Sequence, residues 1–100
     1  MLAREIGNLQ EEGHALYVPG LVAESEGDLS RAEASLLESL AVSRRDAYVP
    51  GIATAQAALA HVLRRDDPER AERAREEALR LAQEHDLIET LLRVTTESAT

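Results

Sequence analysis

The chain has no cysteine, phenylalanine or tryptophan, and only two tyrosines among its 100 residues. Without cysteine it can form neither a disulfide framework nor a thiolate metal site, an absence that fits a cytoplasmic protein. Without phenylalanine and tryptophan it lacks the usual platforms on which nucleic-acid bases stack. The formal net charge of -8 also repels phosphate backbones. We therefore expect no direct binding to nucleic acid.

Long apolar runs are also missing. No run approaches the roughly 20 residues that a membrane-spanning helix needs, and the first residues lack the apolar region of a signal peptide, so we expect no membrane partner. The apolar content of 44% is nevertheless a normal globular value. Alanine and leucine dominate it, as is typical of closely packed helices rather than sheets. The composition predicts one all-α domain spanning residues 1–100.

Apolar residues recur at helical spacing along most of the chain, between recognisable capping signals. The predicted helices are about 2–12, 14–26, 29–45, 51–65, 68–84 and 86–94, with a tail at 95–100. Pro19 either kinks a continuous helix or begins a new one, and we favour the kink. Asp28 alone or a capping box from Ser30 to Glu33 begins the helix 29–45. Asp67 caps the helix 68–84.

Burial can be predicted from the same spacing. In the helix 51–65 apolar residues lie nearly all round, which makes it the most buried of the set. The helix 68–84 is highly charged, and pairs such as Glu69 with Arg73 and Glu76 with Arg80 suggest a solvated face. In the helix 29–45 the expected buried stripe is Leu29, Ala32, Leu36, Leu37 and Leu40, with Ala41 as a further candidate.

One helix corner occurs twice. The phrase Gly-Asp-Leu-Ser-Arg-Ala-Glu at 27–33 returns in altered form at 66–72, with an offset of 39 when counted from Asp28 to Asp67. A second echo, Tyr-Val-Pro-Gly at 17–20 and at 48–51, has an offset of 31, and we interpret it as coincidence or an old rearrangement. Two helices in about 34 to 47 residues are typical of α-solenoid repeats.

The segment 18–39 resembles the tetratricopeptide repeat superfamily. Gly20, Ala23, Gly27 and Ala32 fall on the family's small, packing and turn positions. The phrases Gly-Asp-Leu-Ser-Arg-Ala-Glu and Ser-Leu-Leu-Glu-Ser-Leu-Ala are also similar to the repeats in the C-terminal regions of large bacterial ATP-dependent transcriptional regulators of the maltose-regulator type. The resemblance implies antiparallel helical hairpins stacked as a short right-handed superhelix.

The resemblance also implies a function, which is to bind a peptide or a partner protein on the concave face. In such repeats the first helix of each pair lines that face. The partner-binding residues implied in this chain are His14, Tyr17, Leu21, Glu24 and Gln56. Two alternatives remain open: a self-associating, dimeric helical scaffold, and a small-molecule sensor with a pocket beside Pro19 and Gly20.

Catalytic and metal-binding patterns are not found. The spacings between His14, His61 and His85 place no two of them on one helix face. The paired carboxylates, including Glu76 and Glu77, are expected at caps or on solvated faces, and the serines have no activating base near them in the sequence. We expect no enzymatic activity, no metal and no cofactor.

Overall fold

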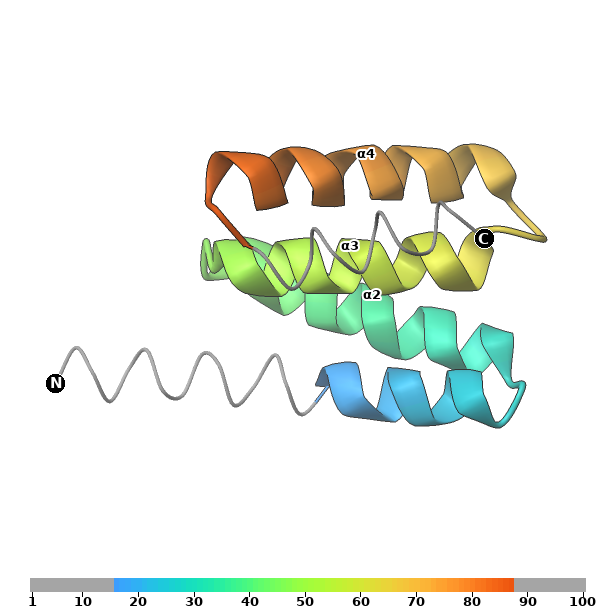
Figure 1. Cartoon of the computed structure of the whole chain (residues 1–100). Coiled ribbons are helices and arrows are strands. Elements are labelled where there is room, and N and C mark those ends of the chain that lie inside the picture. Colours follow the sequence, from blue (N-terminus) through green and yellow to red (C-terminus); the bar gives the residue numbers. More distant parts are fainter. Residues whose placement is uncertain (1–15, 88–100) are drawn as a thin grey trace, which may run out of the picture.

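The computed structural model describes residues 16–87, and in this part of the chain every regular element is a helix (Figure 1). The first helical stretch covers 16–25. It is followed by α2 (Leu29–Arg45), α3 (Val49–Leu63) and α4 (Pro68–Glu84). The all-α prediction is therefore confirmed for the described residues. The predicted helix 2–12, the tail 95–100 and all but the first two residues of the predicted helix 86–94 lie outside them.

Two helix predictions match the structure in their bounds, and the prediction for the helix 51–65 is shifted. The helices 29–45 and 68–84 have the predicted bounds, but the predicted helix 51–65 begins at Val49 and ends at Leu63. Pro50 lies in the first turn of α3, where its missing N–H leaves no hydrogen bond unmade, so the helix can begin before it. Helical residues flank Pro19 on both sides, so the favoured prediction of a continuous helix is confirmed over 16–25, one residue short of its predicted end.

The repeat is visible in the helix caps. The Asp28 side chain accepts a hydrogen bond from the backbone N–H of Arg31 at 3.2 Å, and Asp67 accepts one from Arg70 at the same distance. These aspartates begin α2 and α4, and they are the pair from which the longer repeat offset was counted. Of the two caps that the sequence allowed for α2, the aspartate is the one formed.

Three of the described helices end in the same corner. In each, one residue takes a left-handed conformation: Gly27 with φ 81°, Ala47 with φ 53° and Asp86 with φ 56°. The next residue then donates its N–H back to the carbonyl five residues earlier, as Tyr48 does to Ser43 at 2.8 Å and Leu87 to Ala82 at 2.8 Å. This is the Schellman arrangement, which satisfies the free carbonyls of a helix end. Ala47 and Asp86 are separated by the same offset as the two capping aspartates.

α3 occupies the centre of the fold. It packs against α2 on one side and α4 on the other, whereas α2 and α4 do not pack against each other (Figure 1). Its central position explains its burial, because eight of its fifteen residues are buried. The prediction that this helix is the most buried of the set is confirmed for the described helices. The buried residues are Ala53, Ala55, Gln56, Ala57, Ala58, Leu59, Val62 and Leu63.

Two glycines allow neighbouring helices to approach α2 closely. A Cβ on Gly20 would lie 2.9 Å from Leu36 Cγ, and one on Gly51 would collide with Ser43 and lie 2.8 Å from Tyr48 Cδ2. Both glycines end a Tyr-Val-Pro-Gly phrase. The two Tyr-Val-Pro-Gly segments therefore both place a glycine against α2. Their offset of 31 residues in the sequence does not indicate this shared role.

The buried stripe of α2 differs in part from the prediction. Ala32 and Leu36 are buried as expected, but Ser39 and Ser43 continue the stripe, and Leu37 is 39% exposed. The buried positions follow the side that meets the helix 16–25 and α3. Leu37 lies on the side towards α4, which does not approach closely enough to cover it.

Candidate functional site

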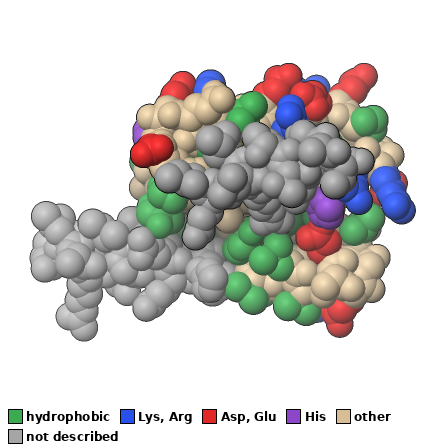
Figure 2. Space-filling view, viewed as in Figure 1, with side chains coloured by type: hydrophobic (Ala, Val, Ile, Leu, Met, Phe, Trp, Pro, Cys, Tyr) green, Lys and Arg blue, Asp and Glu red, His purple; other side chains and the backbone are tan. Residues whose placement is uncertain are grey.

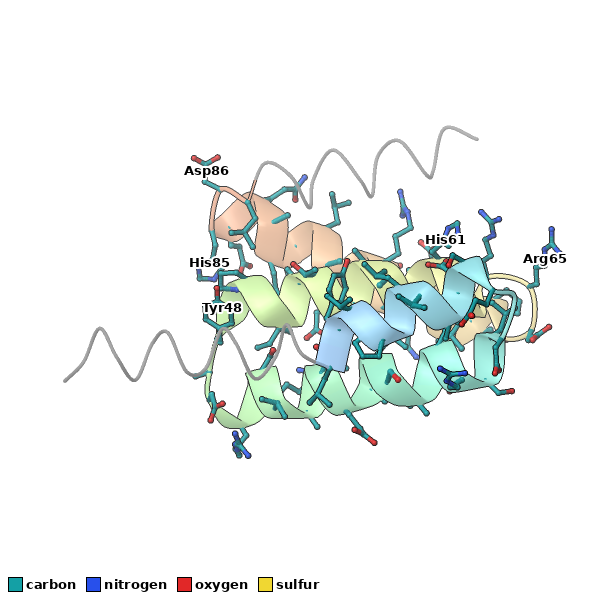
Figure 3. The ribbon with its side chains drawn as sticks, turned by 90° about the horizontal axis from the view of Figure 1, so that it is seen from below. Tyr48, His61, Arg65, His85 and Asp86 are labelled. Atoms are coloured by element: carbon teal, nitrogen blue, oxygen red, sulfur yellow. The ribbon has the colours of Figure 1, made fainter. Side chains whose placement is uncertain are left out.

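The first candidate surface is the first-helix face, which we define as Tyr17, Leu21, Glu24 and His61. Tyr17 and Leu21 are half-buried and pack on the core that joins the helix 16–25 to α2, α3 and α4. Glu24 Oε2 lies 2.9 Å from His61 Nε2, so a carboxylate and an imidazole connect the helix 16–25 to α3. His61 lies in the last turn of α3 (Figure 3).

The structure brings together only some of the predicted partner-binding residues. Tyr17, Leu21 and Glu24 share the helix 16–25. Gln56 is buried and contacts Glu77 of α4, so it belongs to a different surface. His14 lies outside the described residues.

The second candidate surface is a groove between α2 and α4, which we call the α2/α4 groove. Its volume is about 410 Å³. α3 forms the floor, because α2 and α4 are held apart on either side of it. The lining is mainly leucine and alanine, with two arginines, a glutamine and a glutamate, namely Leu37, Leu40, Gln56, Leu59, Leu63, Arg70, Arg73, Ala74 and Glu77.

Ion pairs join α2 to α4 at both ends of this groove. Near the start of α2, Glu33 Oε2 lies 3.1 Å from Arg70 Nη1. Near its end, Arg44 donates to Glu77 through both terminal guanidinium nitrogens, from Nη2 at 2.6 Å and from Nη1 at 3.3 Å. The leucines of the α2 wall lie between these two pairs in the sequence. Ion pairs thus connect the parallel helices α2 and α4, which do not pack closely against each other.

Glu77 is the most connected of these groups. Besides Arg44, its carboxylate accepts a hydrogen bond from the Gln56 amide, and Arg80 Nη2 lies 3.7 Å away. Partial burial raises the pKa of Glu77, but the hydrogen bonds from Gln56 and Arg44 and the charges of Arg44 and Arg80 outweigh it. The pKa of Glu77 is therefore lowered from the ordinary value of 4.5. The carboxylate is ionised at neutral pH and its negative charge is compensated.

Arg73 differs from the other charged residues of the groove. It is exposed, and within the described part of the chain no carboxylate pairs with it. The predicted pair with Glu69 does not form, and Arg80 binds Glu77 and Glu84 rather than the predicted Glu76. Across the groove from Arg73, between the two ion pairs, α2 presents Leu37 and Leu40 instead of an acid.

The rest of the α4 surface mixes both signs of charge. Figure 2 shows acidic and basic side chains together along the edge formed by α4, and Arg75 pairs with Glu72 at 3.3 Å. Among residues 16–87, no three histidine or acidic side chains gather as metal ligands would. His61 and His85 lie at opposite ends of the α3–α4 hairpin (Figure 3). None of the described helices is both long enough and apolar enough to cross a bilayer.

Sequence reasoning missed the α2/α4 groove because its contacts join distant parts of the chain. Glu77 looked like a solvated acid within a charged helix, and its partners Arg44 and Gln56 are 33 and 21 residues away. Leu37 looked like a core residue. The available signal was Gln56, a polar residue within the most apolar helix, which needs a buried hydrogen-bond partner.

Comparison with known proteins gives no relative for this arrangement. No family model, no curated protein and no solved structure matches the chain. The described residues form a helical-hairpin protein with two candidate binding surfaces, the first-helix face and the α2/α4 groove.

Proposed function

We propose that this chain is a protein-interaction module made of tetratricopeptide-like helical hairpins, without enzymatic activity, that binds a peptide or a partner protein on the first-helix face. One observation carries the proposal. The caps of α2 and α4 and the corners that follow these helices recur at one common offset along the chain. A structural unit repeated at this length is typical of α-solenoids, whose extended surfaces bind other proteins. A place within a larger bacterial regulator is part of the same proposal.

The residues of the first-helix face suit this function. Tyr17 and Leu21 are held by the core while part of each side chain stays accessible. Tyrosine is enriched in interface hot spots, where a partner covers its large ring and its hydroxyl can hydrogen-bond. Glu24 and His61 add polar groups at the same helix junction.

The experiment is selection from a phage-displayed peptide library on the purified 100-residue chain, followed by nuclear magnetic resonance mapping of the bound site. We expect binders that shift the amides around Tyr17 and Leu21. Tyr17→Ala is expected to weaken binding by about tenfold or more, as for a moderate hot spot. Tyr48→Ala is the matched control. A folded chain that enriches no peptide above background would reject the proposal.

A second candidate function, self-association, is favoured by two exposed valines. Val18 and Val22 lie one turn apart on the helix 16–25 and are 39% and 47% exposed. An exposed apolar pair on the first described hairpin is where another copy could stack. Sedimentation of the chain should then show a dimer that Val22→Ser weakens and that Ser30→Ala, at an exposed position on α2, does not. A monomer at high concentration would rule this candidate out.

A further inference from the structure

We infer that the α2/α4 groove is a second docking surface, and that it fits an amphipathic helix of a partner protein that carries a carboxylate beside its apolar stripe. This surface belongs to the second helix of each hairpin. It is separate from the first-helix face and does not depend on the function proposed for that face.

The first step is the order of side chains along the groove. Glu33 of α2 meets Arg70 of α4 at one end, and Arg44 meets Glu77 at the other. Between them α4 supplies another arginine, Arg73, but α2 supplies only leucines. The series of acid–base pairs is therefore incomplete in the middle, and the missing group is a carboxylate.

The second step is charge. The chain has a net charge of -8, and of the two arginines that line the groove Arg70 is paired with Glu33 and Asp67, whereas Arg73 has no acidic neighbour at bonding distance among the described residues. Glu77, the only acid in the groove lining, is already bound by Arg44, Gln56 and Arg80. An incoming carboxylate would meet Arg73 without displacing these contacts. A guanidinium binds a carboxylate through two parallel hydrogen bonds, which gives the contact a defined geometry.

The third step is the apolar lining. Leu59 and Leu63 form the floor and are almost completely buried, while Leu37 on the wall is 39% exposed. A helix that places apolar residues at i, i+3 and i+7 would cover Leu37 and reach the floor. A carboxylate at i+4 would then lie on the same side of that helix, close to Arg73.

A polypeptide fits this surface better than a small carboxylic acid. Small-molecule pockets enclose most of the surface of their ligand. Here two of the lining residues, Leu37 and Arg73, are exposed, so the groove is open along its wall. It can hold one side of a helix but cannot enclose a free ligand.

The test uses a phage-displayed library of amphipathic helical peptides, randomised beside a fixed leucine stripe, selected on the whole 100-residue chain. We expect an enrichment of Asp or Glu next to the stripe. An enriched peptide is then synthesised with its Glu and with Gln in its place. Arg73→Gln should weaken binding of the Glu peptide about tenfold, the contribution of one partly exposed charge-assisted hydrogen bond, and leave binding of the Gln peptide unchanged.

Two further variants keep the result interpretable. Leu37→Ser should weaken binding of both peptides, because it removes apolar contact rather than charge. Arg65→Gln is the matched control, since Arg65 is an exposed arginine that points away from the helices at the corner after α3 (Figure 3). Circular dichroism of each variant checks that the helices remain intact.

Three results would overturn the inference. One is an equal effect of Arg73→Gln on both peptides, or no effect on either. Another is binding that Tyr17→Ala removes and the groove variants leave unchanged, which would support the first-helix face alone. The third is a dimer of the chain that Arg73→Gln dissociates, because a second copy would then occupy the groove.

Discussion

Gly20 lets the helix 16–25 approach α2 more closely than any residue with a side chain would permit. A Cβ there would lie 2.9 Å from Leu36 Cγ, 3.0 Å from Leu36 Cδ2 and 3.4 Å from the Ala32 carbonyl oxygen. Leu36 is fully buried, so it cannot move aside without disturbing the core. The glycine is thus required by packing, since the sequence around it is otherwise helical.

We predict that Gly20→Ala destabilises the protein by about 1–2 kcal/mol. Overpacking of a full core costs roughly 1–3 kcal/mol, and the better helix propensity of alanine returns about 1 kcal/mol at most. Urea unfolding followed by circular dichroism measures the change. The loss should be smaller in a Leu36→Ala background, where space is available. The same loss in both backgrounds would show that the contact with Leu36 is not the cause.

Glu77 makes stability depend on pH at a single residue. Its pKa is lowered in the folded protein, so folding favours the ionised carboxylate. The stabilisation is present above the ordinary pKa of 4.5 and is lost as the pH falls through the lower folded-state pKa. Protonation at low pH makes the side chain resemble glutamine.

Glu77→Gln should therefore lower the free energy of unfolding by about 1–2 kcal/mol at pH 7, a value expected for hydrogen bonds to a partly exposed charged group. The difference from the wild-type protein should decrease as the pH falls below 4.5. Chemical unfolding at a series of pH values measures it. Glu76→Gln, at an exposed position next in sequence, is the control. A difference that stays constant between pH 7 and pH 3 would contradict this account.

At the scale of the element, the corner after α2 contains a residue in an unfavourable conformation. Ala47 has φ 53°, a left-handed geometry that costs a residue with a Cβ roughly 1–2 kcal/mol. Gly27 takes the equivalent position in the preceding corner without that cost. The corner is retained because its hydrogen bonds satisfy the carbonyls at the end of α2.

We predict that Ala47→Gly stabilises the protein by about 0.5–1 kcal/mol, since the relief of strain exceeds the extra entropy that glycine has in the unfolded chain. Ala41→Gly, at an exposed position within α2, should have the opposite effect and cost about 1 kcal/mol. Thermal unfolding of both variants distinguishes them. If Ala47→Gly destabilised the protein, the left-handed conformation would not be the controlling feature.

The elements themselves were largely predictable from the sequence, because their signals are local. The aspartate caps and the helical spacing of apolar residues gave the bounds of α2 and α4. The start of α3 was missed by two residues, because a proline in a first turn looks the same in the sequence as one that ends a helix. The exposure of Leu37 depends on how far α4 lies from α2, and no local pattern contains that distance.

For the whole molecule, the central place of α3 determines how stability is distributed. α3 packs against both α2 and α4, while α4 packs closely against α3 but not against α2. Local unfolding should therefore release α4 before α3.

We predict that the amides of α3 exchange with solvent at least about tenfold more slowly than those of α4, after correction for intrinsic rates. Hydrogen exchange followed by mass spectrometry or nuclear magnetic resonance measures the difference. Arg44→Gln, which removes one of the two ties between α2 and α4, should speed exchange in α4 and have less effect in α3. Equal protection of both helices would mean that the fold opens as one unit.

The candidate site was less predictable than the fold. The family resemblance directed attention to the helix 16–25, and three of its predicted residues do share that helix. Gln56 was assigned to the same surface, but its side chain meets Glu77. The α2/α4 groove depends on two helices whose backbones do not pack closely and on ion pairs between residues far apart in the sequence. Such a surface exists only once the hairpins are stacked.

The matching corners at Ala47 and Asp86 have a consequence for building with this protein. Each is closed by a hydrogen bond to the carbonyl five residues earlier, and the two lie one repeat apart. Suppose that a second copy of residues 48–86 is joined directly after Asp86. Its first helix would then follow α4 at the same angle at which α3 follows α2. The chain therefore contains the joint needed for a tandem array, whose length could be set by the number of copies.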